Sequence, residues 1–119
     1  MRTLIKTLLG VGLAAALAAP ATATGLAIYE SDPHLGGTSF IAMTGRPPRT
    51  TPDIKVVCTQ NGATVKQQKK PADAGGAYFT WAQTELWPSG GATCEAKLQK
   101  YTKQGDVRVL AELVFRVSG

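Results

Sequence analysis

The strongest constraint on this chain lies near its C-terminal end, where apolar residues recur at every second position from residue 107 to residue 117. Arg108, Glu112 and Arg116 fall between them, and a period of two does not fit the apolar stripe of a helix. The segment therefore predicts one long β-strand. Its core-facing side chains are expected at the odd positions, which are Val107, Val109, Ala111, Leu113, Phe115 and Val117.

A second strand precedes it, because Cys94, Ala96 and Leu98 alternate with polar residues. Residues 102–106 between the two strands predict a hairpin. Inward positions must face inward positions, and the choice of register follows from charge. Pairing Cys94 with Phe115 sets Lys97 opposite Glu112 and Tyr101 opposite Arg108, whereas a slip by two residues opposes Glu95 and Glu112.

Turn residues interrupt the rest of the chain at the spacing that is typical of β-sandwiches. Asn61-Gly62 supplies the positive φ angles of a tight hairpin turn. About seven strands and no convincing helix result, which predicts an all-β, two-sheet sandwich. The remaining strands are expected at Leu26–Glu30, Thr38–Thr44, Ile54–Thr59, Ala63–Gln68 and Ala77–Ala82.

The N-terminal segment has the order of a cleavable signal peptide. Arg2 and Lys6 precede an uncharged run rich in Leu and Ala, and a small-residue site ends at Ala23. The apolar run is too short to cross a bilayer, so no retained membrane span is expected. Residues 1–23 are assigned to the signal peptide and residues 24–119 to a single domain, which is expected to be secreted or extracytoplasmic.

Cys58 and Cys94 are the two cysteines of the chain. An exported chain reaches an oxidising compartment, and two cysteines have a single possible connectivity. We therefore expect one Cys58–Cys94 disulfide bond.

Three segments carry a resemblance to a known architecture: Ile54–Gly62, Trp87–Leu98 and Val107–Val117. Together they resemble small bacterial secreted domains of the immunoglobulin-like or fibronectin type III-like sandwich, a group in which many members have no characterised function. The resemblance implies an immunoglobulin-like fold of about seven strands. One departure is that the second expected strand, Thr38–Thr44, has no cysteine, so the bridge is expected to join neighbouring strands of one sheet. Trp81 or Trp87 is expected to pack near it.

Residues that carry catalysis are scarce. His34 is the single histidine, it lies in an expected loop, and no nucleophile sits in a recognisable elbow. The cysteines and His34 cannot form a zinc site, and the acidic residues are too dispersed for a calcium loop. We therefore expect no enzymatic activity, no catalytic residue, no metal site and no cofactor.

Basic residues are in modest excess. The formal charge of +5 includes Arg2 and Lys6, so their removal leaves +3, which is weak support for any particular partner, and export argues against nucleic acid. If their strands share a sheet, several lysines are candidates for one basic face, although solvated lysines that protect strand edges are the simpler interpretation. These candidates are Lys66, Lys69, Lys70, Lys97 and Lys100.

Two other groups are candidate contacts for a partner. Arg46-Pro47-Pro48-Arg49 predicts a stiff basic loop. Leu110 and Val114 fall on the expected outward face of the last strand, and an edge strand with an apolar stripe can receive a partner strand. Alternatively, another segment such as Leu26–Glu30 covers them.

The favoured hypothesis is a non-enzymatic exported module that binds a protein or another component of the cell envelope or extracellular space, or has a structural role there. The alternative is a small secreted inhibitor or effector that acts through the loop from Arg46 to Arg49. Neither the partner nor the oligomeric state follows from the sequence.

Overall fold

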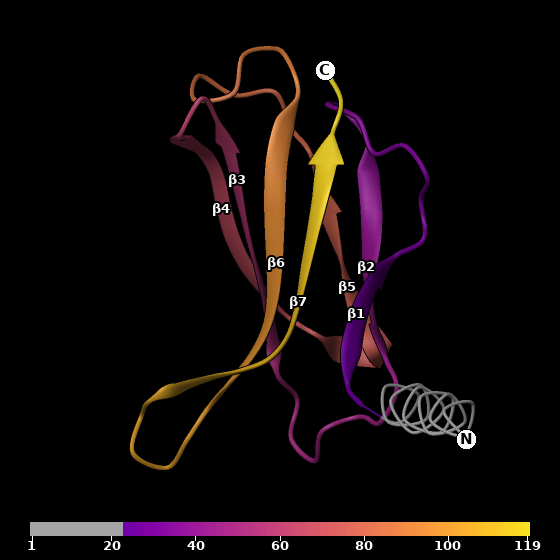
Figure 1. The fold of residues 1–119 in the computed structure, drawn as a ribbon, viewed down its shortest axis with the longest axis vertical. Coiled ribbons are helices and arrows are strands. Elements are labelled where there is room, and N and C mark those ends of the chain that lie inside the picture. Colours follow the sequence, from indigo (N-terminus) through magenta and orange to yellow (C-terminus); the bar gives the residue numbers. More distant parts are fainter. Residues whose placement is uncertain (1–22) are drawn as a thin grey trace, which may run out of the picture.

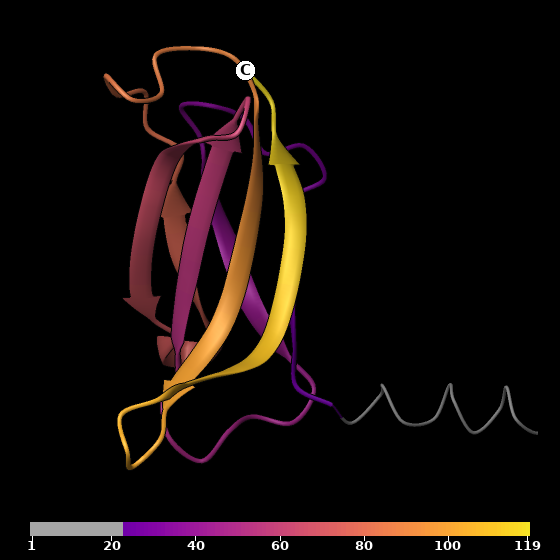
Figure 2. The same ribbon diagram turned by 60° about the vertical axis from the view of Figure 1, so that its left-hand side comes forward.

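Seven strands form two antiparallel sheets that face each other (Figures 1 and 2). The structure is a computed structural model and describes residues 23–119, so the expected signal segment lies outside the described residues except for Ala23. One sheet has the order β1-β2-β5 and the other β4-β3-β6-β7. The strands are β1 (Gly25–Ile28), β2 (Thr38–Thr44), β3 (Asp53–Gln60), β4 (Ala63–Pro71), β5 (Gly76–Thr80), β6 (Ala92–Tyr101) and β7 (Val107–Val117).

This architecture confirms the expected all-β, two-sheet fold. The tight turn at Asn61-Gly62 is also confirmed, because the two residues have φ angles of 48° and 84°. Residues 73–75 form a single turn of 3₁₀ helix before β5. β4 continues to Pro71, further than the expected end at Gln68.

The disulfide bond lies between two neighbouring strands at the middle of the large sheet. Cys58 of β3 and Cys94 of β6 stand directly opposite each other, with 4.0 Å between their Cα atoms, and both are fully buried. The expected bridge within one sheet is therefore confirmed.

Aromatic side chains fill the space between the sheets. Trp81 and Trp87 are completely buried. The Trp81 ring stacks on Phe79 with 6.3 Å between ring centroids and meets Phe115 at 5.5 Å. Phe115 stands opposite Cys94 in the sheet, so Trp81 packs beside the strand pair that holds the bridge.

A chain of hydrogen bonds links the core to the loop after β1. The buried Trp81 Nε1–H group donates to Ser39 Oγ over 2.8 Å, and the Ser39 hydroxyl donates to the Glu30 carboxylate. Ser39 is itself buried. The hydroxyl therefore satisfies an indole donor that has no access to water.

The register of the last hairpin is confirmed at the end away from its turn and wrong next to the turn. Cys94 pairs with Phe115 and Lys97 with Glu112, but Tyr101 pairs with Val107 and not with Arg108. The difference is one extra residue, because Leu98 pairs with Ala111 whereas Gln99 pairs with Val109. This β-bulge leaves Leu110 without a direct partner and reverses the alternation of β7 beyond it.

The bulge overturns three expected side-chain orientations. Val107 and Val109 were expected to face the core but are exposed, and Leu110 was expected to point outward but is partly buried against the core. Val114 lies on the other side of the bulge and points outward as expected, with 65% of its surface exposed. The apolar stripe of Leu110 and Val114 is therefore divided between two faces.

β7 is an edge strand, as expected, but one end of that edge is closed. The Ser118 N–H group donates to the Pro33 carbonyl, and the Leu35 N–H group donates to the Ser118 carbonyl, both over 2.8 Å. β1, which belongs to the small sheet, also contacts β7. A partner strand would therefore meet a free edge only before residue 118.

We predict that removing the disulfide bond lowers the free energy of unfolding by about 4 kcal/mol. The reason is that the bridge closes a loop with a sequence separation of 36 residues and restricts the unfolded chain. Urea denaturation of the mature domain carrying both Cys58→Ala and Cys94→Ala measures this loss. The reduced wild-type domain serves as the control, and an unchanged stability in both samples would contradict the prediction.

We also predict that Ser39→Ala destabilises the fold by about 1–3 kcal/mol, because the buried Trp81 N–H group loses its acceptor. Thr38→Val is the matched control, since the neighbouring Thr38 hydroxyl is exposed. Urea denaturation followed by tryptophan fluorescence makes the comparison, and equal midpoints for the two variants would refute this role of Ser39.

Candidate binding face

The large sheet presents one of its faces to solvent. On β3, Lys55 and Val57 alternate with the buried Ile54, Val56 and Cys58, and the cross-strand register extends this alternation to the neighbouring strands. We call the solvent-facing side the outer face. Its central residues are Lys55, Val57, Gln67, Lys69, Glu95, Lys97, Gln99, Tyr101, Val107, Val109, Glu112 and Val114.

Three lysines stand side by side across the outer face. Lys55 of β3 is directly opposite Lys69 of β4 and directly opposite Lys97 of β6. We call these three residues the lysine row. Like charges on directly opposed residues repel, so the Lys69–Lys55 and Lys55–Lys97 pairs are each unfavourable, whereas Glu112 stands opposite Lys97 on its other side.

Neighbouring side chains contact the two ends of the lysine row. The Lys97 ammonium lies 3.7 Å from the Glu95 carboxylate, the one ion pair among residues 23–119. The Lys69 ammonium donates to the Tyr101 hydroxyl over 2.7 Å, and this hydrogen bond raises the pKa of Lys69 above its ordinary value. Lys55, in the middle, has no acidic partner within the described part of the chain.

A cleft of about 320 Å³ opens at the Lys69 end of the row. Tyr101 is 51% exposed there, and its hydroxyl accepts a hydrogen bond from the Lys69 ammonium. Gln99 retains 9% of its surface exposed. The lining residues are Lys55, Gln67, Gln68, Lys69, Gln99, Tyr101 and Val107.

The bulge in β7 builds one wall of this cleft. With regular alternation Val107 would turn toward the opposite face, but the extra residue Leu110 brings Val107 opposite Tyr101 on the outer face. A bulge that redirects side chains beside a cleft is a common device in β-sheets. The cleft thus combines cationic, amide and apolar groups.

Two of the lysines expected on a basic face lie elsewhere. Lys66 and Lys70 belong to the edge strand β4. They stand opposite Cys58 and Ile54 of β3, which face inward. The Lys66 ammonium lies 5.9 Å from the Trp81 ring centroid. Burial lowers the pKa of Lys66, and the positive charge of Lys70 lowers it further.

Lys70 reaches from β4 to the small sheet, where its ammonium donates to the Tyr78 carbonyl and lies 5.5 Å from the Phe79 ring centroid. The five lysines expected on one basic face are therefore split. Lys69 and Lys97 join the unexpected Lys55 on the outer face, whereas Lys66 and Lys70 bridge toward β5.

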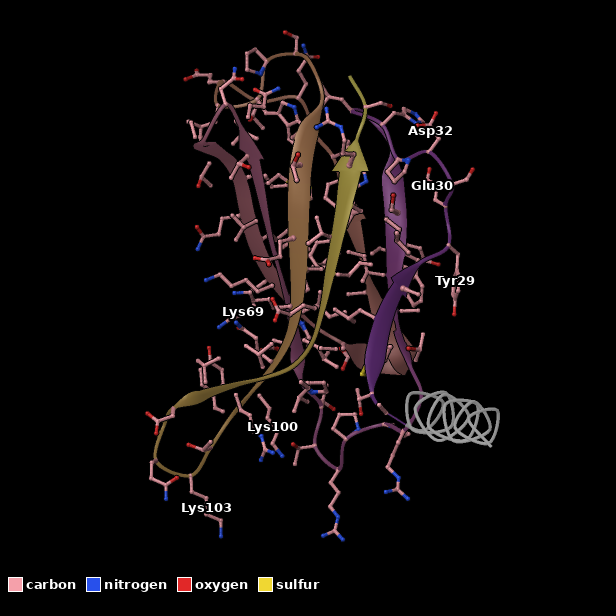
Figure 3. The ribbon with its side chains drawn as sticks, viewed as in Figure 1. Tyr29, Glu30, Asp32, Lys69, Lys100 and Lys103 are labelled. Atoms are coloured by element: carbon pink, nitrogen blue, oxygen red, sulfur yellow. A yellow bond between two sulfur atoms is a disulfide. The ribbon has the colours of Figure 1, made fainter. Side chains whose placement is uncertain are left out.

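Lys100 belongs to a third region, the turn end of the β6–β7 hairpin. It pairs with Arg108, and Lys103 lies in the turn. Figure 3 shows Lys100 and Lys103 at one end of the molecule and Glu30 and Asp32 toward the other. The loop that carries Arg46 and Arg49 joins β2 to β3 at the same end as the hairpin turn (Figure 1).

Arg46 and Arg49 are both exposed in this loop. The Thr24 hydroxyl donates to the Arg46 carbonyl and ties the loop to the start of the expected mature chain. The arginines thus remain accessible but are separate from the lysine row. No described contact indicates a partner for them.

The end that carries Glu30 holds a second cleft, of about 530 Å³, between the loop after β1 and the end of β7. Asp32 and Arg116 both line it. His34 lies beside it, with Nδ1 3.4 Å from the Asp32 carbonyl oxygen. Within residues 23–119 no three His, Cys, Asp or Glu side chains gather in a potential metal site, and no helix is long and apolar enough to span a membrane.

Several residues of the outer face were missed by the sequence analysis. Lys55 was detectable, because the alternation around Cys58 points it away from the core. Val107 was not detectable, because its position depends on the bulge. No protein-family model, curated protein or solved structure matches this chain.

We predict that Lys55→Gln stabilises the domain at low salt, because it removes the middle charge of the lysine row. The urea midpoint of the variant should exceed that of the wild-type domain at about 0.01 M salt, where the Debye length is about 30 Å. The two midpoints should coincide at about 1 M salt, where the Debye length is about 3 Å. Lys103→Gln is the control of equal charge in the hairpin turn. A salt-dependent gain of the same size in that control would contradict the prediction.

Proposed function

We propose that this chain is an exported, non-enzymatic binding module of the immunoglobulin-like or fibronectin type III-like kind, and that it binds an anionic partner through its outer face. The single observation that carries the proposal is the lysine row of Lys69, Lys55 and Lys97. The signal-like segment supports export, and the buried Cys58–Cys94 bridge is compatible with an oxidising compartment.

The lysine row has an energetic cost in the free domain. Directly opposed lysines repel, and this repulsion at the centre of the sheet does not contribute to folding. A bound anion reverses the sign of the effect, because it interacts favourably with all three ammonium groups. The lysine row is thus unfavourable in the free domain and favourable in the complex.

The position of the row suits recognition. β3 and β6 are the central strands of the large sheet. The disulfide bond joins them at Cys58 and Cys94, along the same two strands that hold Lys55 opposite Lys97. Side chains on rigid strands hold a binding geometry better than side chains on loops. The hydrogen bond from Lys69 to the Tyr101 hydroxyl orients one ammonium group before a ligand binds.

We predict that the mature domain binds dextran sulfate, a polyanion, and that the triple variant Lys55→Gln, Lys69→Gln, Lys97→Gln binds it at least about tenfold more weakly. Isothermal titration calorimetry at several salt concentrations measures both affinities. The slope of affinity against salt concentration should also become shallower, because fewer charges take part in binding.

The matched control removes the same number of positive charges from the hairpin end, with Lys100→Gln, Lys103→Gln and Arg108→Gln. If binding followed net charge alone, both triple variants would weaken equally. Equal weakening, or no binding by the wild-type domain, would refute the outer face as the anion-binding surface.

A further inference from the structure

The cleft beside Tyr101 adds chemistry that a purely electrostatic contact does not need. We infer that it binds an acidic sugar chain, that is, an oligosaccharide with repeated carboxylates, an inference that rests on the proposed function. The lysine row would take the carboxylates, and the cleft would hold one sugar ring. Three features of this surface match such a chain: an exposed aromatic residue, the glutamine side chains that line the cleft and the spacing of the lysines.

Tyr101 offers a flat apolar surface at the end of the row. Its hydroxyl accepts a hydrogen bond from Lys69 at 2.7 Å, whereas the same ammonium is 5.1 Å from the ring centroid. The ammonium therefore lies at the hydroxyl end of the ring, and half of the residue stays open to solvent. The C–H face of a sugar ring packs on such a surface, because an aromatic side chain combines an apolar body with a polar tip.

The amides beside Tyr101 match sugar hydroxyl groups. Gln99 is nearly buried and lines the cleft from β6. Gln67 lines the same cleft from β4. A primary amide both donates and accepts hydrogen bonds, as a hydroxyl does, and a few such groups in an otherwise apolar cleft give orientation and selectivity.

The lysine row fixes the shape of the charged partner. Its members lie on adjacent strands, and neighbouring strands of a sheet are about 4.8 Å apart. This step is comparable to the length of one sugar unit, so an extended acidic chain that runs across the strands meets one ammonium after another. Val57 and Val114 supply apolar surface on the next row along the strands.

Two other anionic classes fit less well. Lysine ammonium groups bind phosphate as well as carboxylate, so the preference for an acidic sugar over a polyphosphate rests on the exposed Tyr101 ring and the glutamine side chains of the cleft. Single-stranded nucleic acid needs aromatic rings for successive bases, but Tyr101 is the one aromatic residue that lines this cleft. Both classes serve as competing outcomes of the test.

The experiment titrates four probes into the mature domain by calorimetry: a galacturonic acid hexamer, its methyl ester, a polyphosphate of similar charge and a single-stranded oligonucleotide of equal length. We expect the hexamer to bind, the methyl ester to lose binding, and Tyr101→Ala or Gln99→Ala to weaken hexamer binding about tenfold or more. Tyr101→Phe keeps the ring and should retain most of the affinity. Circular dichroism checks that each variant is folded, and upfield-shifted sugar C–H resonances report packing on the ring.

The outcomes separate this inference from the proposed function. If the polyphosphate and the hexamer bind equally and Tyr101→Ala changes neither, the sugar inference is wrong although the anion-binding face stands. A preference for an oligonucleotide of equal length would likewise overturn it. If no anionic probe binds, both the inference and the proposed function fail.

Discussion

The pairing of β3 with β6 sets the geometry on which the rest of the molecule depends. Cys58 and Cys94 stand opposite each other in that pair, and their bond makes a slip between the two central strands impossible without breaking it. A slip by one residue would exchange the buried and exposed faces, so it would carry the lysines into the core. The disulfide bond therefore secures two things together: the buried row of apolar side chains and the cross-strand alignment of Lys55 with Lys97.

The candidate site arises where that regular pairing is interrupted. From Ala111 to Val117, β7 follows the alternation of the core, whereas Val107 and Val109, on the turn side of Leu110, present the opposite face. The irregularity thereby places Val107 opposite Tyr101 on the outer face, next to the end of the lysine row. A regular hairpin would have kept the charge pattern but not the apolar wall. The site thus combines side chains of β3, β4 and β6 that follow from strand register with an apolar wall that follows from one inserted residue.

Much of the fold was predictable because its signals are local. Strict alternation identified β7, Asn61-Gly62 identified a hairpin turn, and two cysteines that follow a signal-like segment identified the bridge. The bulge was not predictable, because Val109, Leu110 and Ala111 are all apolar and leave the alternation ambiguous there. The destination of Lys66 and Lys70 was also hidden, because it depends on how closely β5 approaches the edge strand β4. The sequence pattern could therefore predict that Lys55 faces outward, but the position of Val107 depends on the tertiary arrangement.

The turn end of the β6–β7 hairpin extends past the body of the sandwich (Figures 1 and 2). Val107 and Val109, which lie between the turn and the bulge, are exposed. Few packing contacts therefore protect the backbone hydrogen bonds at this end of the hairpin. Amide hydrogen exchange should therefore be fast at the tip and slow near Cys94, with the change at Leu98 and Gln99. Tyr101 lies on the fast-exchanging side, whereas Lys55 lies on the rigid side. The candidate site consequently spans a boundary in local stability, and any ligand that bridges it would slow the exchange of the tip.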